Sequence, residues 1–211
     1  SLEDFGRKCD AIGKGMTTAG RTLSTAVTTP IIALGTTAVK ASLDFESTFT
    51  SVRKTVDATE AEFDALAEAS KTMSTQIATS TGEINEVMAT AGQLGIRNDY
   101  LVDFARTMID LGNSTDIVAN EAASTLAKFA NITNMDQSRF GNLGATLVDL
   151  GNNFATTESS IMEMSLRLAA AGHQVGLTEP QILGFAAALS SVGIEAEMGG
   201  SAFSKALVKM E

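Results

Sequence analysis

One histidine and one cysteine limit the chemistry that this 211-residue chain could perform. His173 lies in the glycine-rich stretch from Gly172 to Gly176, and Cys9 lies in a distant part of the sequence. A Ser/His/Asp or Cys/His nucleophile needs its base within hydrogen-bond reach, and no partner can be assigned to His173. A structural zinc site needs about four His, Cys or carboxylate ligands. We therefore predict that His173 is a turn residue, and we expect no metal site and no cofactor.

Two pairs of carboxylates could in principle act as a general acid and base. Glu83 and Glu86 share a helix face, as do Glu60 and Asp64. A glycosidase needs such a pair in a cleft with the pKa of one member raised, whereas solvated helix faces carry such pairs routinely. The stretch Gly172 to Gly176 lacks the Lys and the preceding strand of a phosphate-binding loop. The sequence therefore predicts no catalytic residues and a protein that is not an enzyme.

The composition favours helices. Apolar residues make up 44% of the chain, Pro occurs twice, Tyr once and Trp never. Few residues with strand propensity and few helix breakers are typical of a helical protein. We predict an all-α fold, with a coiled-coil-like N-terminal helix and long helices followed by stacked short helical hairpins.

The charge is unevenly distributed along the chain. Residues 1–40 contain five basic and three acidic side chains, whereas residues 41–211 contain ten basic and 22 acidic ones. An acidic body repels phosphate backbones, so stable binding to nucleic acid is not expected. Simple solubility is the other interpretation of this acidity.

Residues 1–29 are predicted to form an oligomerising amphipathic helix. Their apolar side chains follow alternating spacings of three and four residues over about three heptads, a pattern typical of a coiled-coil seam. A single amphipathic helix packed on its own domain remains the alternative. The candidate oligomer interface consists of Leu2, Phe5, Cys9, Ile12, Met16, Leu23, Ile31 and Ile32.

Residues 30–79 are predicted to contain an apolar segment and long helices. The stretch from Thr22 to Val39 has no charged side chain, but its apolar portion is short for a membrane span. Insertion of this stretch into a membrane is kept as a minority hypothesis. Beyond it, an apolar stripe runs along a helix and is interrupted near Asp57, where a break is expected.

Residues 80–211 are predicted to be a domain of helical-hairpin repeats. The sequence Asp110-Leu111-Gly112-Asn113 recurs as Asp149-Leu150-Gly151-Asn152, about 39 residues later. Such a period, with two helical patterns separated by glycine, is typical of stacked hairpins. The predicted core faces contain Ile84, Val87, Met88, Ala91, Leu101, Phe104, Met108, Leu111, Leu126, Phe129, Ala130, Leu143, Leu147, Leu150, Ile161, Met164, Leu168, Ile182, Phe185, Leu189, Phe203, Leu207 and Met210.

Helix boundaries in this domain are predicted from capping residues. Ser80 with Glu83, and Thr178 with Gln181, have the spacing of a capping box. Thr115 and Thr156 are expected to cap helices over residues 116–130 and 157–171. The C′ positions that end the preceding helices are assigned to Gly95, Gly112, Gly151 and Gly176.

Residues from about 22 to 211 resemble the N-terminal conserved region of TP901-type phage tail tape measure proteins. The resemblance rests on four stretches in order: TTPIIALGTTAVKASLDFESTFTSVRK, ATAGQLGI, NSTDIVANEAASTLAKFANI and AAAGHQVGLTEPQILGFAAALSSVGI. The chain departs from the family pattern at Val118, where the family often has a small capping residue. This departure leaves the start of the helix over residues 116–130 open.

The resemblance implies a structural role in the tail of a phage or a phage-tail-like particle such as a tailocin. It implies a homo-oligomer, with a homotrimer expected, that sets tail length, occupies the tail lumen and tail tip, and leaves ahead of the DNA during ejection. The implied partners are tail tube proteins, tail-tip or baseplate hub proteins and, on ejection, the host membrane. The chain itself is expected to be a fragment of a longer protein.

Two other functions are compatible with the same residues. A helical-repeat adaptor domain would bind a protein partner along the stacked hairpins. A cell-wall hydrolase would show lytic activity that Glu83→Gln removes, an outcome that the missing catalytic set argues against.

Overall fold

The computed structural model describes residues 43–208 of the chain. The chain divides into two compact units, Ser1–Glu46 and Ser47–Glu211, and only residues 43–46 of the first unit are described. The described part is all-α and contains no strand, as the sequence predicts. The candidate interface residues from Leu2 to Ile32 lie outside the described residues. The proposed domain boundaries at residues 29 and 79 stay predictions.

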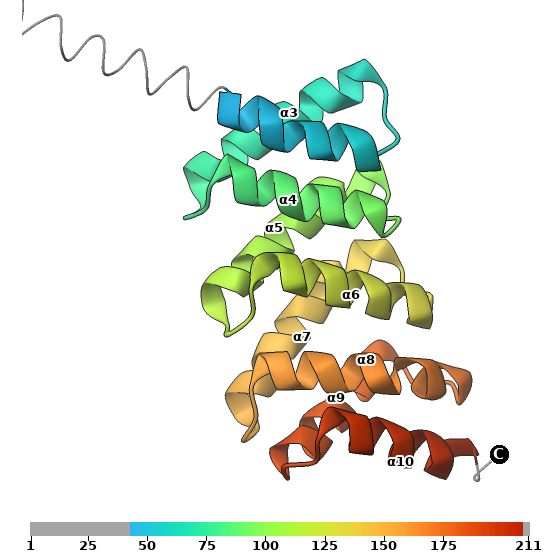
Figure 1. Cartoon of the computed structure of the whole chain (residues 1–211). Helices are drawn as coiled ribbons and strands as arrows, with labels where there is room; N and C mark the ends of the chain where they lie inside the picture. Colours follow the sequence, from blue (N-terminus) through green and yellow to red (C-terminus); the bar gives the residue numbers. More distant parts are fainter. Residues whose placement is uncertain (1–42, 209–211) are drawn as a thin grey trace, which may run out of the picture. The chain divides into compact units, whose positions relative to one another are not determined.

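Short loops connect a series of helices of similar length (Figure 1). After a helical segment over residues 43–55, the chain forms α3 (Glu60–Gln76), α4 (Thr81–Gln93), α5 (Asn98–Ser114), α6 (Ala119–Thr133), the short 3-10 helix η2 (Gln137–Arg139), α7 (Phe140–Asn153), α8 (Glu158–Gln174), α9 (Glu179–Ser191) and α10 (Ala196–Val208). Within the described residues, no helix is both long enough and apolar enough to span a bilayer.

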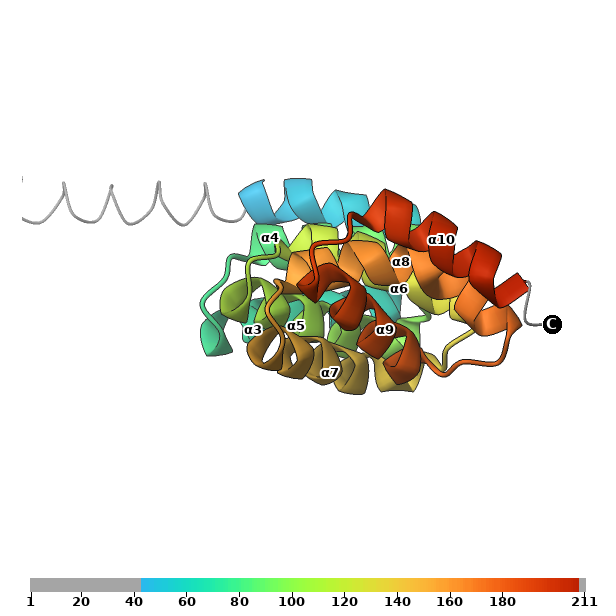
Figure 2. The same cartoon turned by 90° about the horizontal axis from the view of Figure 1, so that it is seen from below.

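The helices of the second unit stack in two layers. The even-numbered helices α4, α6, α8 and α10 pack side by side in one layer, and the odd-numbered helices α3, α5, α7 and α9 form the other (Figures 1 and 2). The two layers contact each other through the pairs α3–α4, α4–α5, α5–α6, α7–α8 and α8–α9. This arrangement is the stack of helical hairpins that the sequence period predicts.

Capping residues explain where several helices begin. Thr178 and Gln181 form the predicted capping box, in which the backbone N–H of Thr178 donates to Oε1 of Gln181 at 2.9 Å. The hydroxyl of Ser80 accepts from the backbone N–H of Glu83 at 3.1 Å. The carboxylate of Glu83 does not complete the second box, because it accepts from Oγ1 of Thr79 instead, at 2.7 Å.

Two predicted N-caps are wrong by a few residues. Helix α6 begins at Ala119 with Val118 as N-cap, and Thr115 instead ends α5, where its hydroxyl donates to the carbonyl of Leu111 at 2.8 Å. Helix α8 is capped by Thr157 and not by Thr156. The departure at Val118 from the family pattern therefore coincides with a helix that starts without a side-chain cap.

The assigned glycines fall into two groups. Gly95 and Gly176 adopt positive φ just after α4 and α8, as expected for glycines that end helices. Gly112 and Gly151 do not end helices, because they lie inside α5 and α7. A Cβ on Gly112 would lie 3.0 Å from the backbone nitrogen of Ala119, so this glycine allows close approach of the next helix.

The predicted core is confirmed for most of its described members. Phe104, Met108, Leu126, Phe129 and Leu168 are among the largest fully buried side chains. The rings of Phe104 and Phe140 pack edge to face with centroids 4.6 Å apart, which joins α5 to α7. Leu150 on α7, Leu189 on α9 and Phe203 on α10 are partly exposed, and Phe185 on α9 is exposed.

Candidate interaction surface

The carboxylates that could do chemistry are solvated. Glu60 accepts two hydrogen bonds from the guanidinium of Arg53, at 3.0 and 2.9 Å, and this contact lowers the pKa of Glu60 below its ordinary value. A general acid needs a raised pKa, so the shift at Glu60 runs the wrong way for catalysis. Asp64, Glu83 and Glu86 are exposed on α3 and α4.

The histidine and the hollows of the described surface offer no reactive set. His173 is exposed in the last turn of α8 and not in the turn that follows, where the sequence places it. A surface hollow of about 340 Å³ is lined by residues of α5, η2 and α7, including Asp103, Arg106 and Tyr100. Within the described residues, no group of three or more His, Cys, Asp or Glu side chains could hold a metal ion.

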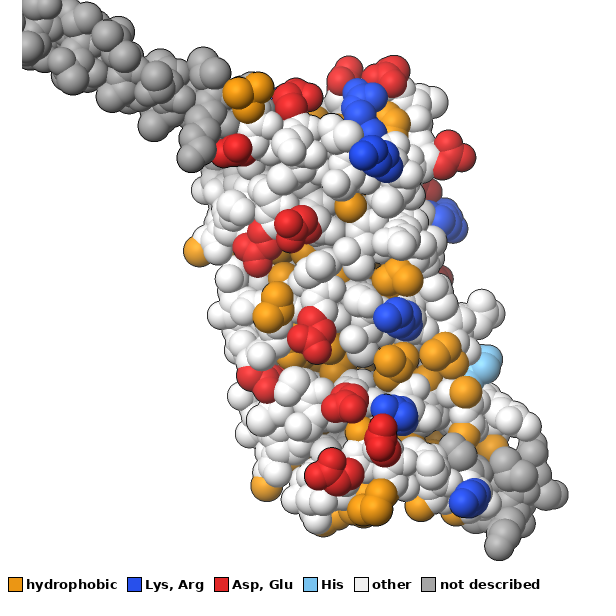
Figure 3. Space-filling model, viewed as in Figure 1, with side chains coloured by type: hydrophobic (Ala, Val, Ile, Leu, Met, Phe, Trp, Pro, Cys, Tyr) orange, Lys and Arg blue, Asp and Glu red, His pale blue; other side chains and the backbone are white. Residues whose placement is uncertain are grey.

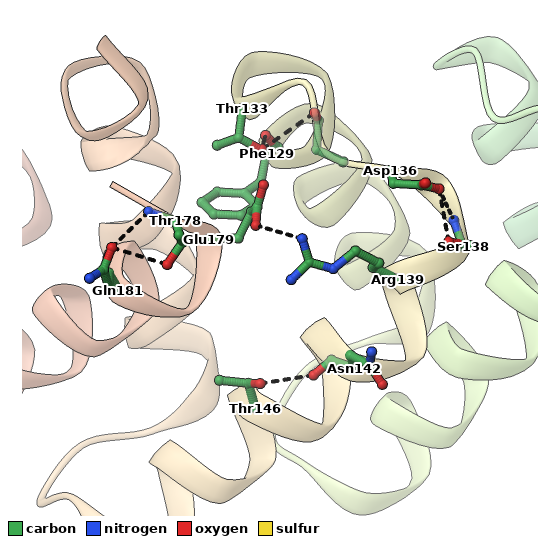
Figure 4. Close-up of polar contacts among 11 residues, drawn as sticks. Phe129, Thr133, Asp136, Ser138, Arg139, Asn142, Thr146, Thr178, Glu179 and Gln181 are labelled. Carbon is green, nitrogen blue, oxygen red and sulfur yellow. Dashed lines mark hydrogen bonds and ion pairs between the residues drawn. The ribbon is translucent and has the colours of Figure 1, made fainter. Parts of the chain in front are cut away.

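Several polar side chains connect one hairpin to the next, and we call each such set of contacts a joint. Figure 4 shows such a joint, in which the guanidinium of Arg139 at the start of α7 reaches the carboxylate of Glu179 at the start of α9, at 3.3 Å. The same carboxylate belongs to the first turn of α9, beside the capping box of Thr178 and Gln181. The joint therefore fixes the N-terminal ends of two neighbouring odd-numbered helices together.

The loops on the same edge are tied by side-chain amides. Oε1 of Gln137 accepts from the backbone N–H of Arg97 at 2.9 Å, and Nε2 of Gln137 donates to the carbonyl of Gly95 at 3.1 Å. Nδ2 of Asn98 donates to the carbonyl of Asp57 at 2.8 Å. These bonds satisfy loop backbone groups that no helix can pair.

On the opposite edge, Asp116 in the loop before α6 binds the start of α8. Its carboxylate accepts from the backbone N–H of Ser159 at 3.1 Å and from the Ser159 hydroxyl at 2.5 Å. Burial alone would raise the pKa of Asp116, but the hydrogen bonds from Ser159 outweigh it, so the pKa lies below its ordinary value. Asp116 thus caps the N-terminus of a helix one repeat away.

One joint is buried at its centre. The hydroxyl of Ser70 on α3 donates to Oδ1 of Asn85 on α4 at 2.7 Å, and Nδ2 of Asn85 donates to Oγ1 of Thr48 at 2.9 Å. Ser70 and Asn85 are fully shielded from solvent. A buried polar network that is fully paired specifies one register between the elements that carry it.

Sequence reasoning missed these joints, although the sequence contains a signal for some of them. The partners in the joints of Arg139, Gln137 and Asp116 lie 40 to 43 residues apart, which is close to the repeat period. What the arrangement can do is mechanical: it holds the hairpins in a regular stack.

Comparisons with known proteins relate this chain to phage tail proteins. Residues 67–211 match the family described as phage-related minor tail protein. A probable tape measure protein of Halomonas phage phiHAP-1 is 25% identical over 185 residues, which is 82% of this chain. The chain spans only 22% of the length of that relative. No solved structure matches the chain.

Proposed function

We propose that this chain, which belongs to the phage-related minor tail protein family, is a segment of a tail tape measure protein. Membership of this family indicates that the chain is a component of a phage tail. Two observations support the assignment to a tape measure protein. One is the match to a probable tape measure protein over 82% of the chain, and the other is the order of the four stretches that resemble the TP901-type region. A repeat of hairpins suits a ruler, because its length grows by equal steps.

We further propose that the protein occupies the tail lumen near the tip, sets tail length and leaves ahead of the DNA. Its partners there would be further copies of itself, with a trimer expected, and the tube and tip or baseplate proteins. Ten basic against 22 acidic side chains in residues 41–211 support this placement, since such a body would not hold passing DNA.

Insertion of extra repeats tests the ruler. One repeat from the start of α6 to the residue before α8 is residues 119–157. In a phage that carries this chain, one to three extra copies of this segment are inserted after residue 157, and tail lengths are measured by electron microscopy. A stacked hairpin adds about 10 Å per copy, because packed helices lie about 8–10 Å apart. The same residues as one extended helix would add about 58 Å per copy.

Equal increments in tail length support the ruler, and their size tells which form the segment takes inside the tail. Tails of unchanged length with every number of inserted copies contradict it. Phage carrying the surface substitution Ile132→Ser serve as a control, because this side chain is exposed and the tail length should not change.

A helical-repeat adaptor remains the second candidate function. The regular two-layer stack favours it, because such stacks present extended surfaces to protein partners. An adaptor would tolerate extra repeats without any change in tail length, so the insertion experiment separates the two functions.

A further inference from the structure

One loop edge of the stack differs in composition from the other. It contains the loops that lead from each odd-numbered helix to the following even-numbered helix, residues 77–80, 115–118, 154–157 and 192–195. We call this side the acidic edge. It lies on the left in Figure 1, opposite the loops that hold Gln137 and Arg139.

The loops and helix ends of the acidic edge contain carboxylates and no Lys or Arg. Arg106 and Arg167, which lie outside these segments, reach two of the carboxylates, Asp110 at 4.0 Å and Glu197 at 3.5 Å. Neither Lys nor Arg occurs in residues 77–86, 110–127, 147–166 or 190–204, which form the loops and the adjoining helix ends. In Figure 3, the Lys and Arg of the visible face lie away from this side, whereas Asp and Glu lie toward it and also at the upper right. The carboxylates are Glu83, Glu86, Asp110, Asp116, Glu121, Asp149, Glu158, Glu163, Glu195 and Glu197.

Helix dipoles explain only part of this charge. Acidic residues stabilise the N-termini of the even-numbered helices, as Glu83, Glu121 and Glu158 do in the first turns of α4, α6 and α8. The helix dipole also favours basic residues at the C-termini of the odd-numbered helices, which end at this edge. The last turns of α3, α5, α7 and α9 contain none. Local helix stability therefore does not account for the missing cations.

Exposed apolar side chains recur along the same edge. Val118 is 65% exposed, Phe154 is 42% exposed and Val192 is 72% exposed, each in a successive loop, and Ile77 in the first loop is half-buried. Val118 is also the N-cap of α6 and makes no capping bond. A Ser, Thr or Asp there would stabilise the helix by about 1 kcal/mol, so an apolar residue at this position opposes local stability.

We propose that the acidic edge binds a basic amphipathic helix of a partner protein that runs along the stack. Neighbouring packed helices lie about 8–10 Å apart, so successive loops offer one apolar contact at about that interval. An α-helix rises about 10.5 Å in seven residues, so one apolar residue per heptad meets each loop in turn. Lys and Arg beside this stripe complement the carboxylates. The edge has this composition whichever of the two functions above the chain performs.

Binding of designed peptides to the whole chain tests the proposal. The probe is a helical peptide of about four heptads with one Leu per heptad flanked by Lys, and titration calorimetry measures its Kd. A peptide of the same composition with the Leu residues out of register is the first comparison. We expect the heptad peptide to bind at least about tenfold more tightly, and its affinity to fall as salt is raised.

Matched variants locate the binding site. Phe154→Ser on the acidic edge should raise the Kd about tenfold, whereas Ile132→Ser should leave it unchanged, although the two side chains are exposed to similar extents, 42% and 41%. Val118→Thr should weaken binding while raising the midpoint of thermal unfolding, because it adds a cap. Circular dichroism verifies that each variant is folded.

Three results would overturn the proposal. The first is no binding of the heptad peptide up to about 1 mM. The second is equal binding of both peptides, or equal effects of Phe154→Ser and Ile132→Ser. The third is self-association of the chain that Phe154→Ser abolishes, because a second copy would then be the occupant of the edge.

Discussion

Single glycines in this chain act through close packing as well as through turns. Gly112 and Ala119 are seven residues apart in sequence and pack closely. A Cβ added to Gly112 would meet the Cβ, the backbone nitrogen and the Cα of Ala119 at 3.0 to 3.2 Å. The recurrence of Gly in the DLGN motif is visible in the sequence. Its role is not, because a C′ glycine and a contact glycine look alike until the helix end is known.

Gly112→Ala is expected to destabilise the fold by about 1–3 kcal/mol, because backbone atoms of Ala119 cannot yield to the added methyl group. Gly141→Ala on α7 is the matched control, since nothing lies within 4 Å of its added Cβ. There the better helix propensity of Ala should stabilise by about 1 kcal/mol. Urea denaturation measures the free energy of unfolding of both variants. Equal changes in Gly112→Ala and Gly141→Ala would contradict the packing role of Gly112.

Asp116 should make stability depend on pH. Its folded pKa is lowered, so its contribution is complete above the ordinary carboxyl pKa and is lost as the pH falls through the folded value. The midpoint of thermal unfolding should therefore be higher in the wild type than in Asp116→Asn at pH 7, and the difference should shrink below about pH 4. A difference independent of pH would show that the charge is not involved.

At the scale of elements, local signals predict helices better than they predict joints. The box of Thr178 and Gln181 follows from four consecutive positions, so the sequence alone identifies it. The start of α6 was misplaced because Val118 gives no capping signal and Thr115 gives a false one. The joints of Asn85 and Arg139 depend on packing between helices, which only the structure supplies.

The buried joint between α3 and α4 should be sensitive to loss of a partner. Asn85→Ala leaves the Ser70 hydroxyl buried without its acceptor and should destabilise by about 2–3 kcal/mol. Thr72→Ser on the exposed face of α3 serves as the control and should change stability by less than about 0.5 kcal/mol. The double variant Ser70→Ala with Asn85→Ala should be destabilised by less than the sum of the destabilisations of the two single variants. Additive effects would argue against a shared network.

At the scale of the whole molecule, the repeat period predicts the stack because periodic apolar faces can be buried only against a copy of themselves. The all-α class and the hairpin repeat follow from the sequence on that ground. The N-terminal seam stays a prediction, since its residues lie outside the described part. The acidic edge was missed because its parts are spread over four loops that come together only in the folded stack.

Sedimentation equilibrium of the whole chain tests the seam. We expect a trimer that Ile12→Asp converts to a monomer, because the charge would lie on the a/d stripe. Thr18→Asp adds the same charge off the stripe and should leave the trimer intact. A monomer in the unchanged protein at high micromolar concentration would contradict the trimer and its seam.

The stack has a mechanical consequence. Within the described residues, extensive contacts between α-helices join only helices that are no more than two helices apart along the chain. Tension applied to the ends should therefore peel hairpins off one after another, at modest force, with no single event that releases the whole. Optical tweezers would then record a staircase with about 39 residues released per step, and one large rupture would contradict it. A thread that unravels stepwise can pass through an opening far narrower than its folded form.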